Sequence, residues 1–300
     1  MKKIGFIGCG TMGKPMALNL IKAGYALTVR DLNPQPVEEL VAAGATAAHS
    51  PREVAEKSEV VITMLTSSPH VEQVMFGPDG VLEGLKKGSV IIDMSTIDPL
   101  VTRKVAAAAA EKGLKMLDAP VTGLQAKATD GTLTIMVGGD KELFEQYKDI
   151  LQVMGEKIYH VGDVSMGEVV KLTNNLMGVI AGIGACEGLL FGIKLGADPK
   201  VLHEVITHGG GNSFFLERLA PYPGLVPSAP VNNDFTPGFT TDLMAKDIGL
   251  ILSAAEANKV PLLVCSLVRQ LIEVSQARGY GKKDWTIVSK IINELGGAEA

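Results

Sequence analysis

Short apolar runs alternate with helical segments along the first half of the chain. The runs are nearly continuous in hydrophobic character, as in strands that are buried on both faces of a parallel sheet. The segments between them repeat apolar positions at the spacing of an amphipathic helix, and glycines mark several of their ends. The pattern predicts an α/β domain with a mostly parallel sheet. Its strands are expected at residues 3–7, 26–30, 60–65, 90–94, 115–119, 133–137 and 157–161.

The pattern changes after about residue 163, where convincing strands cease. A long apolar helix is expected at about residues 165–194, at the junction, and the remainder of the chain is typical of an all-α domain. We therefore predict two domains, residues 1–163 and 164–300. The later helices are predicted at 199–208, 240–258, 261–278 and 283–295, and an ordered surface loop at 221–238.

The junction helix is apolar enough to raise the question of a membrane span. Its core, residues 176–193, is almost long enough to cross a bilayer. It contains Glu187, and its glycines recur every four residues, which lets another backbone approach a fully buried helix. Because the chain has no second span of this kind, we expect a buried helix of a soluble protein and no membrane contact.

The composition is that of a soluble, folded protein. Of its 300 residues, 46% are hydrophobic and 20% are charged, which argues against a disordered chain. The formal charge of −5 gives no general attraction to nucleic acid or to an anionic membrane, so an anionic substrate needs a local site. Three scattered cysteines form no disulfide framework, and no signal peptide is recognisable, so a cytoplasmic location is expected.

A glycine-rich loop with the letters GCGTMG starts at Gly8, between the first strand and the first helix. In that context the motif indicates a Rossmann-type dinucleotide site. Gly8 permits the tight turn, Gly10 lets a pyrophosphate reach the backbone, and Gly13 lets the helix pack on the strand. Thr11 and Met12 complete the expected cofactor contacts, with the phosphates on the N-terminus of the helix.

Asp31 ends the second predicted strand, roughly 20 residues past the glycine loop. A carboxylate at this place accepts hydrogen bonds from an adenosine ribose and repels a 2′-phosphate, which favours NAD over NADP. Arg30 next to it keeps NADP open as the minority alternative. The structural alternative for Asp31 is a turn residue before Asn33 and Pro34.

Polar loops follow the strands predicted at residues 60–65 and 90–94. In an open parallel sheet, ligands bind at the carboxyl ends of the strands. Leu65, Thr66 and Thr96 are therefore candidate cofactor contacts. A role as N-caps of the next helices is the alternative, and it does not exclude contact with a cofactor.

Gly167, Lys171 and Asn175 lie four residues apart at the start of the junction helix, and hence on one face of it. A lysine in such an apolar run needs a reason, because burying a lone charge is costly. The simpler alternative is a lysine whose stem reaches out to water. His203 and His208 have no third ligand at a useful spacing, so no metal site is expected.

Four stretches together resemble the β-hydroxyacid dehydrogenases, a family that includes 3-hydroxyisobutyrate dehydrogenase, tartronate semialdehyde reductase and sulfolactaldehyde reductase. The glycine loop resembles the dinucleotide signature, and DAPVTGL at residues 118–124 resembles the substrate signature DAPVSGG. The stripe of Gly167, Lys171 and Asn175 resembles the catalytic signature, and LMAKD at residues 243–247 the C-terminal cofactor signature. The resemblance covers essentially the whole chain. It implies a Rossmann-type domain and an all-α domain joined by a long interdomain helix.

The resemblance also implies an NAD-dependent oxidoreductase that interconverts a small β-hydroxyacid and its semialdehyde. Lys171 is then the general acid/base for the hydroxyl proton, and Asn175 orients the substrate or the amine. Thr122 and Gly123 hold the acid group of the substrate with a hydroxyl and backbone N–H groups. Lys246 approaches the nicotinamide end of the cofactor.

The substrate turn departs from the family pattern, because Thr122 replaces a serine and Leu124 replaces a glycine. A side chain at Leu124 reshapes the anion site, so Leu124 is expected to bear on which acid group is accepted. PYPG at residues 221–224 resembles the 3-hydroxyisobutyrate branch, whereas Trp285 resembles the sulfolactaldehyde branch. Asn212 is a further candidate substrate contact, with a helix cap as its alternative.

Several alternatives stay open on the sequence alone. The substrate is 3-hydroxyisobutyrate-like, or else tartronate semialdehyde, sulfolactaldehyde or a related short semialdehyde. A homodimer and a homotetramer are both compatible with the glycine-faced helix. A non-catalytic binding scaffold is the remote alternative, which the presence of Lys171 and the absence of a basic tail disfavour.

Overall fold

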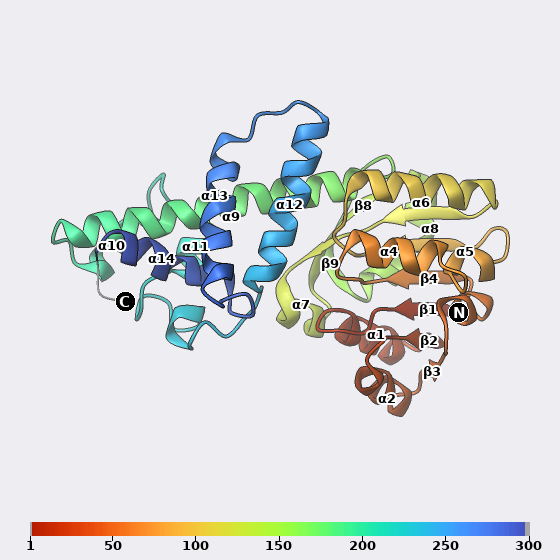
Figure 1. The fold of residues 1–300 in the computed structure, drawn as a ribbon. Helices are drawn as coiled ribbons and strands as arrows, with labels where there is room; N and C mark the ends of the chain where they lie inside the picture. Colours follow the sequence, from red (N-terminus) through yellow and green to blue (C-terminus); the bar gives the residue numbers. More distant parts are fainter. Residues whose placement is uncertain (1, 298–300) are drawn as a thin grey trace. The chain divides into compact units, whose positions relative to one another are not determined.

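The structure, a computed structural model, describes residues 2–297 of the chain. It falls into two compact units, Met1–Lys171 and Leu172–Ala300 (Figure 1). The helix α9 (Met166–Lys194) begins in the first unit and continues as one helix into the second. The predicted long helix at about residues 165–194 is therefore confirmed.

A nine-stranded sheet forms the centre of the first unit. Its strands are β1 (Ile4–Ile7), β2 (Leu27–Arg30), β3 (Thr46–Ala47), β4 (Val60–Thr63), β5 (Val90–Asp93), β6 (Lys115–Asp118), β7 (Val121–Thr122), β8 (Leu133–Gly138) and β9 (Gly155–Gly162). They are ordered β3-β2-β1-β4-β5-β6-β8-β7, and β9 pairs with β8. Pairing is parallel from β3 to β6, whereas β8 runs antiparallel to β6. Because the strand order reverses between β1 and β4, a ligand is expected at their carboxyl ends.

Two hydrophobic clusters cover opposite faces of this sheet. Successive side chains of a strand point to opposite faces, so Val60 and Ile62 enter one cluster and Val61 the other. The first cluster packs against α1 and α8, and the second against α3 to α6. The helices are α1 (Gly13–Lys22), α2 (Pro34–Ala42), α3 (Pro51–Glu56), α4 (Ser68–Phe76), α5 (Val81–Gly84), α6 (Pro99–Glu111), α7 (Leu124–Asp130) and α8 (Lys141–Gln152).

The predicted fold class is confirmed, and each of the predicted strands is present. The sequence pattern does not reveal β3 and β7, because two residues are too few to show an alternation. The strand predicted at residues 60–65 ends at Thr63, so Leu65 lies in the loop after it. Element ends of this kind depend on local hydrogen bonds rather than on periodicity.

Helices pack around α9 in the second unit. Its core joins Val179 and Ile183 of α9 to Ile248, Val268 and other apolar side chains of the later helices. Within the described residues no named strand follows β9, which agrees with the predicted all-α domain. The elements are α10 (Pro199–Thr207), α11 (Phe214–Leu219), η1 (Pro230–Asn232), α12 (Thr241–Ala257), α13 (Leu263–Ala277), η2 (Trp285–Ile287) and α14 (Val288–Leu295).

The predicted surface loop at residues 221–238 is only partly on the surface. It contains η1, and Ala229 and Phe235 are buried. The buried carboxylate of Asp284 accepts hydrogen bonds from the backbone N–H groups of Gly238, at 3.0 Å, and Phe239, at 3.1 Å. These bonds fix the end of the loop to the start of η2, so the loop is ordered as predicted, with most of its residues at the surface and a few packed inward.

The prediction that α9 is fully buried is wrong for the single chain. The helix is long and apolar enough to cross a membrane by length and composition, yet only 28% of its most apolar window is buried. Gly178 and Gly182 meet the rings of Phe215 and Trp285, so side chains, and not the predicted second backbone, approach these glycines. A side-chain carbon added at Gly184 would meet nothing within 4 Å. One glycine stripe of α9 therefore packs inside the unit and part of the other faces open space.

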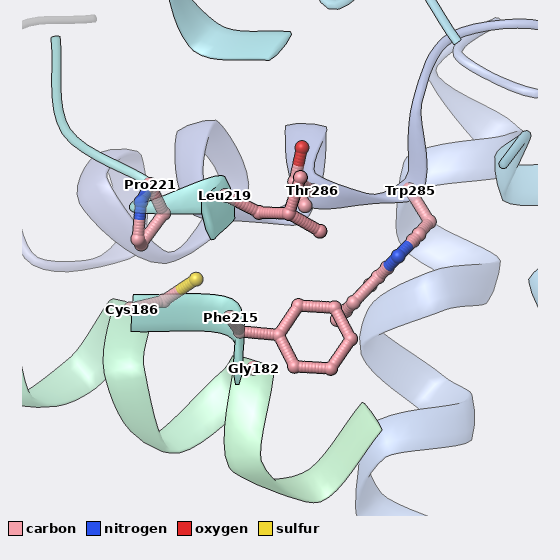
Figure 2. Close-up of a pocket in the computed structure, with 7 residues that line it drawn as sticks. All are labelled: Gly182, Cys186, Phe215, Leu219, Pro221, Trp285 and Thr286. Atoms are coloured by element: carbon pink, nitrogen blue, oxygen red, sulfur yellow. The ribbon is translucent and has the colours of Figure 1, made fainter. Parts of the chain in front are cut away.

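A small cavity lies beside Gly182 in the second unit (Figure 2). Its volume is about 10 Å³, which is close to the space that one water molecule needs. Figure 2 shows its wall of aromatic, aliphatic and thiol groups from α9, α11 and η2. The cavity is a packing gap, too small for a substrate. Its lining residues are Gly182, Cys186, Phe215, Leu219, Pro221, Trp285 and Thr286.

Candidate active site

The glycine loop has the geometry of a dinucleotide cradle. Gly8 adopts φ +95°, a backbone conformation that favours glycine, and a side chain there would overlap the carbonyl oxygen of Met64. A side chain at Gly13 would overlap the carbonyl oxygen of Gly8, so α1 packs directly on the loop. Gly10 is exposed, and a carbon added there would meet nothing within 4 Å. The loop thus leaves its backbone open on the side of the first helix turn, which fits a pyrophosphate.

Asp31 ties the glycine loop to the next helix. Its Oδ2 accepts a hydrogen bond from the N–H of Cys9 at 2.6 Å, and its Oδ1 accepts one from the N–H of Asn33 at 2.7 Å. The turn role of Asp31 is therefore confirmed, and its contact with a ribose stays a prediction. Arg30 donates from Nε to the carbonyl oxygen of His49 at 3.1 Å, so part of its guanidinium is already engaged.

The thiol of Cys9 lies inside this loop and is buried. Burial, followed by the nearby charge of Asp31, raises the pKa of Cys9 to about 12. The thiol therefore stays protonated at neutral pH. Cys9 serves the loop as a small packed side chain.

The loops after β4 and β5 are fastened to each other. The N–H of Leu65 donates to Ser95 Oγ at 2.9 Å, and Thr66 Oγ1 lies 2.8 Å from His70 Nδ1. Ser67 and Asp98 precede α4 and α6 as N-caps, so Thr66 and Thr96 are not caps. Because β1, β4 and β5 are adjacent and parallel, Leu65, Thr66 and Thr96 share the sheet edge of the glycine loop.

The substrate turn follows β7 and carries two unusual backbone conformations. Gly123 adopts φ +142°, and a side-chain carbon there would lie 2.7 Å from Cδ of Lys127. Leu124 adopts φ +61°, in the left-handed region that favours glycine. Such a conformation costs a non-glycine residue roughly 1–2 kcal/mol. The chain therefore places a residue with an isobutyl side chain, 37% exposed, in a backbone conformation that favours glycine.

Lys171 is buried on α9, with 9% of its surface exposed. The interpretation of Lys171 as a lysine that reaches out to water is therefore wrong. Gly167, one turn earlier, has no room for a side chain, because an added carbon would overlap the carbonyl oxygen of Met136. The first turn of α9 thus lies directly against β8. Because Lys171 is one turn further along the same helix, this contact also fixes the position of its backbone.

A buried carboxylate organises the predicted residues of the second unit. Asp247 is 2% exposed, and its Oδ2 accepts a hydrogen bond from Nδ2 of Asn175 at 2.6 Å. Its Oδ1 lies 2.8 Å from Nζ of Lys246. The structure thereby brings Asn175 and Lys246 together. Sequence reasoning did not single out Asp247, although the LMAKD motif contains it, because an acid next to a lysine is usually a solvated pair.

Asn212 is exposed before α11. Its Nδ2 donates to Oε1 of Glu217 at 2.6 Å, and Ser213 caps the helix with its Oγ accepting from the N–H of Leu216 at 3.2 Å. The residue that caps α11 is therefore Ser213 and not Asn212. The role of Asn212 as a substrate contact stays a prediction.

The two histidines considered as metal ligands bind backbone carbonyls instead. A ring nitrogen of His203 lies 2.8 Å from the oxygen of Leu216, and one of His208 lies 2.8 Å from the oxygen of Glu204. Among the residues that the structure describes, no three His, Cys, Asp or Glu side chains cluster as metal ligands would.

Comparisons with known proteins identify both halves of the chain. Residues 3–162 match the family model of the NAD binding domain of 6-phosphogluconate dehydrogenase. Residues 165–292 match the model described as NAD-binding of NADP-dependent 3-hydroxyisobutyrate dehydrogenase. The two matches meet where the sheet ends and α9 begins.

Relatives match over nearly the full length. The NAD-dependent L-serine dehydrogenase of Pseudomonas aeruginosa is 43% identical over 99% of this chain and 100% of its own length. The human mitochondrial 3-hydroxyisobutyrate dehydrogenase is 40% identical over 97% of this chain and 87% of its own. The solved structure of Mycobacterium tuberculosis 3-hydroxyisobutyrate dehydrogenase with L-serine has a TM-score of 0.92 and 34% identity, over 97% of this chain and 99% of that chain. The chain therefore belongs to the β-hydroxyacid dehydrogenase family.

Proposed function

We propose that this protein is an NAD-dependent dehydrogenase that interconverts a small β-hydroxyacid and its semialdehyde. The observation that carries the proposal is the burial of Lys171 on a helix turn that is packed against the sheet. The glycine loop and Asp31 would hold NAD, which when bound would supply a hydride acceptor or donor at its nicotinamide ring. The chain itself has to bind the acid group, orient the hydroxyl and move one proton.

Lys171 moves that proton. During oxidation the substrate hydroxyl loses its proton as the hydride leaves, and Nζ of Lys171 accepts it. In the reverse direction the same amine donates a proton to the carbonyl oxygen. Asn175, whose Nδ2 is held by Asp247, orients the substrate beside the amine. Lys246, held at the same carboxylate, serves the nicotinamide end of the cofactor.

The acid group of the substrate is assigned to the turn after β7. Thr122 offers a hydroxyl, and Gly123 and Leu124 offer backbone N–H groups, which together suit a carboxylate or sulfonate. A 3-hydroxyisobutyrate-like substrate is the first candidate, and tartronate semialdehyde, sulfolactaldehyde and related short semialdehydes are the alternatives. L-Serine is also a β-hydroxyacid, so it belongs among the compounds to be tested.

A substrate panel with both nicotinamide cofactors tests this assignment. We expect NAD-dependent turnover of at least one small β-hydroxyacid, or NADH-dependent reduction of its semialdehyde. A preference for NADP over NAD would contradict the role given to Asp31. Binding of NADH without turnover of any compound would instead favour the scaffold alternative.

Replacing the amine gives the sharpest test of the proton transfer. We expect Lys171→Ala to lower kcat by about 10²- to 10⁴-fold, the range typical of a lost general acid/base. NADH binding, followed by fluorescence, should change little, because the glycine loop is untouched. Lys104→Ala is the matched control, since Lys104 is an exposed lysine paired with Glu72 in the same unit. Near-wild-type kcat in Lys171→Ala would refute the role.

The domain roles follow from where these residues lie in the chain. We assign NAD binding and the turn for the acid group to residues 1–163, and the other substrate contacts and assembly to residues 164–300. We also place the enzyme in the cytoplasm, because Cys9, Cys186 and Cys265 are free thiols.

Assembly as a homodimer or homotetramer is supported by one face of α9. Met177, Gly184, Gly188 and Phe191 of α9 and Leu195 just after it are all exposed, and their spacings of seven, four, three and four residues are those of a helix-packing seam. The two glycines at its centre meet nothing within 4 Å. In a second copy of this chain the same seam could cover it, with the large side chains of one copy packed on the glycines of the other.

A further inference from the structure

A buried carboxylate outside the proton-transfer residues binds the start of α9. Asp118 ends β6 and has no exposed surface. Its Oδ1 accepts a hydrogen bond from the N–H of Ser165 at 2.7 Å, and its Oδ2 accepts one from the N–H of Glu168 at 3.1 Å. These donors lie just before α9 and in its first turn, where helix N–H groups have no partner inside the helix.

The contact leaves the helix little freedom to shift. A side-chain carbon added at Gly138 would lie 2.5 Å from Asp118 Oδ1 and 2.8 Å from the nitrogen of Gly167. One added at Gly167 would lie 2.7 Å from Asp118 Oδ2. The carboxylate is therefore enclosed by β8 on one side and the helix turn on the other. Its two bonds hold α9 both along its axis and in rotation about it.

The residue before the helix is held from outside as well. Ser165 adopts φ +78°, and its Oγ accepts a hydrogen bond from Nε of Arg103 at 2.9 Å. Arg103 comes from α6, so a second element fixes the same backbone. A left-handed conformation in a serine persists only where its surroundings determine it, as these contacts do.

We propose that Asp118 is a positioning residue for Lys171, an inference that rests on the proposed proton transfer. Lys171 follows Glu168 by three residues, so roughly 4.5 Å of rigid helix separates the anchored turn from the backbone of the lysine. A displacement of about 1 Å at a reacting group can cost a hundredfold in rate. The carboxylate thus acts on the reaction through the helix that carries the amine, without contact with substrate or cofactor.

The test compares two aspartates that both cap helices. Asp118→Asn keeps the shape of the side chain but replaces one accepting oxygen with a donor that opposes an N–H group. Asp140→Asn is the control, because Asp140 caps α8 in the same unit by accepting from the N–H of Leu143 at 2.7 Å. We expect Asp118→Asn to lower kcat at least tenfold with NADH affinity within threefold. The pH profile of kcat should show one apparent pKa that disappears in Lys171→Ala. We expect Asp118→Asn to shift this apparent pKa.

Asp140→Asn should lower Tm without changing kcat or its pH profile. Arg103→Met removes the hydrogen bond to Ser165, and Arg103 is exposed, so this variant should fold. If Asp118→Asn folds poorly, Arg103→Met replaces it in the test, with an expected loss in kcat of about threefold. An Asp118→Asn enzyme with kcat within twofold of wild type and an unchanged profile would overturn the proposal. So would equal kcat losses in the two aspartate variants.

Hydrogen–deuterium exchange separates failure of this inference from failure of the proposed function. A wild-type protein without turnover on the whole panel would refute the proposed function alone. In that case faster exchange at residues 165–172 in Asp118→Asn, and not in Asp140→Asn, still supports the anchor. Unchanged exchange there refutes it.

Discussion

Leu124 combines a glycine backbone conformation with a branched apolar side chain. At φ +61° the residue bears a steric cost that a glycine avoids, and it lies in the turn that we propose as the site of the substrate's acid group. The isobutyl group is therefore an addition to the turn rather than a rearrangement of it. Whatever it does to the substrate, it does by occupying space beside the acid group.

Removing this side chain in two steps should show which property matters. We expect both Leu124→Gly and Leu124→Ala to change the ratio of kcat/KM between carboxylate and sulfonate semialdehydes by about tenfold or more, as apolar pocket changes do. The alanine variant keeps the backbone strain and the glycine variant relieves it. A changed kcat/KM ratio in Leu124→Gly but not in Leu124→Ala would therefore assign the effect to the backbone. An unchanged profile in both variants would exclude Leu124 from substrate choice.

Asp93 is a second residue whose environment has a measurable consequence. Its Oδ1 accepts from Thr63 and Ser95, whereas within the described residues its buried Oδ2 has no hydrogen-bond partner. Burial is the largest influence and raises the pKa of Asp93 above its ordinary value of 3.8. The folded state therefore holds a proton at pH values where the unfolded chain has lost it.

The sign of the pH effect follows from that difference. Stability from the protonated carboxyl is fully present below pH 3.8 and is lost as the pH rises through the raised pKa. Asp93→Asn has no such proton to lose. We expect the Tm of wild type, relative to Asp93→Asn, to fall steadily as the pH is raised from about 4, in thermal melts followed by circular dichroism. A Tm difference that does not vary with pH would contradict the assignment.

Two helices, α9 and α12, contain glycines whose surroundings differ. Gly182 faces the ring of Trp285, which itself stacks edge-on against Phe215 at 4.9 Å between ring centroids, so the ring has little room to yield. Gly249 on α12 is exposed, and a carbon added there would meet nothing within 4 Å. Helix propensity favours alanine at both positions, and packing opposes it at only one.

These two glycines give a matched pair of substitutions. We expect Gly249→Ala to raise the free energy of unfolding by about 0.5–1 kcal/mol. Gly182→Ala should lower it by about 1–2 kcal/mol, because overpacking outweighs the gain in propensity. Urea unfolding measures both. Stabilisation by Gly182→Ala would show that the aromatic pair moves aside at little cost.

The same elements show how far sequence reasoning reaches. The sheet, α9 and the three glycines of the cofactor loop could be predicted, because each depends on neighbours within a few residues. The anchor at Asp118 could not, since its hydrogen bonds reach backbone groups 47 and 50 residues away and leave no spacing in the sequence. The burial of Lys171 was also out of reach, because periodicity tells which face a residue is on and not how deeply it lies. Asp247 was missed because an acid next to a lysine is usually a solvated pair.

For the whole molecule, the exposed seam of α9 makes the state of assembly testable. Phe191 is 69% exposed on that seam. We expect Phe191→Glu to reduce the mass measured by light scattering to that of a smaller assembly or a monomer, because it places a charge in an apolar interface. Leu100→Glu is the control, since Leu100 is 54% exposed on α6, outside the seam. An unchanged mass in Phe191→Glu would place the interface elsewhere.

The chemistry of Cys9 sets how such an enzyme responds to its surroundings. With a pKa of about 12, roughly one thiol in 10⁵ is ionised at pH 7, and only the thiolate reacts readily with peroxides or electrophiles. Burial raises the pKa of Cys186 to about 12 and also raises that of Cys265. The thiol of Cys9 in the cofactor loop should therefore react slowly with oxidants. The rate of this dehydrogenase should follow the supply of NAD and substrate, and not the oxidative signals that switch thiol-dependent enzymes on and off.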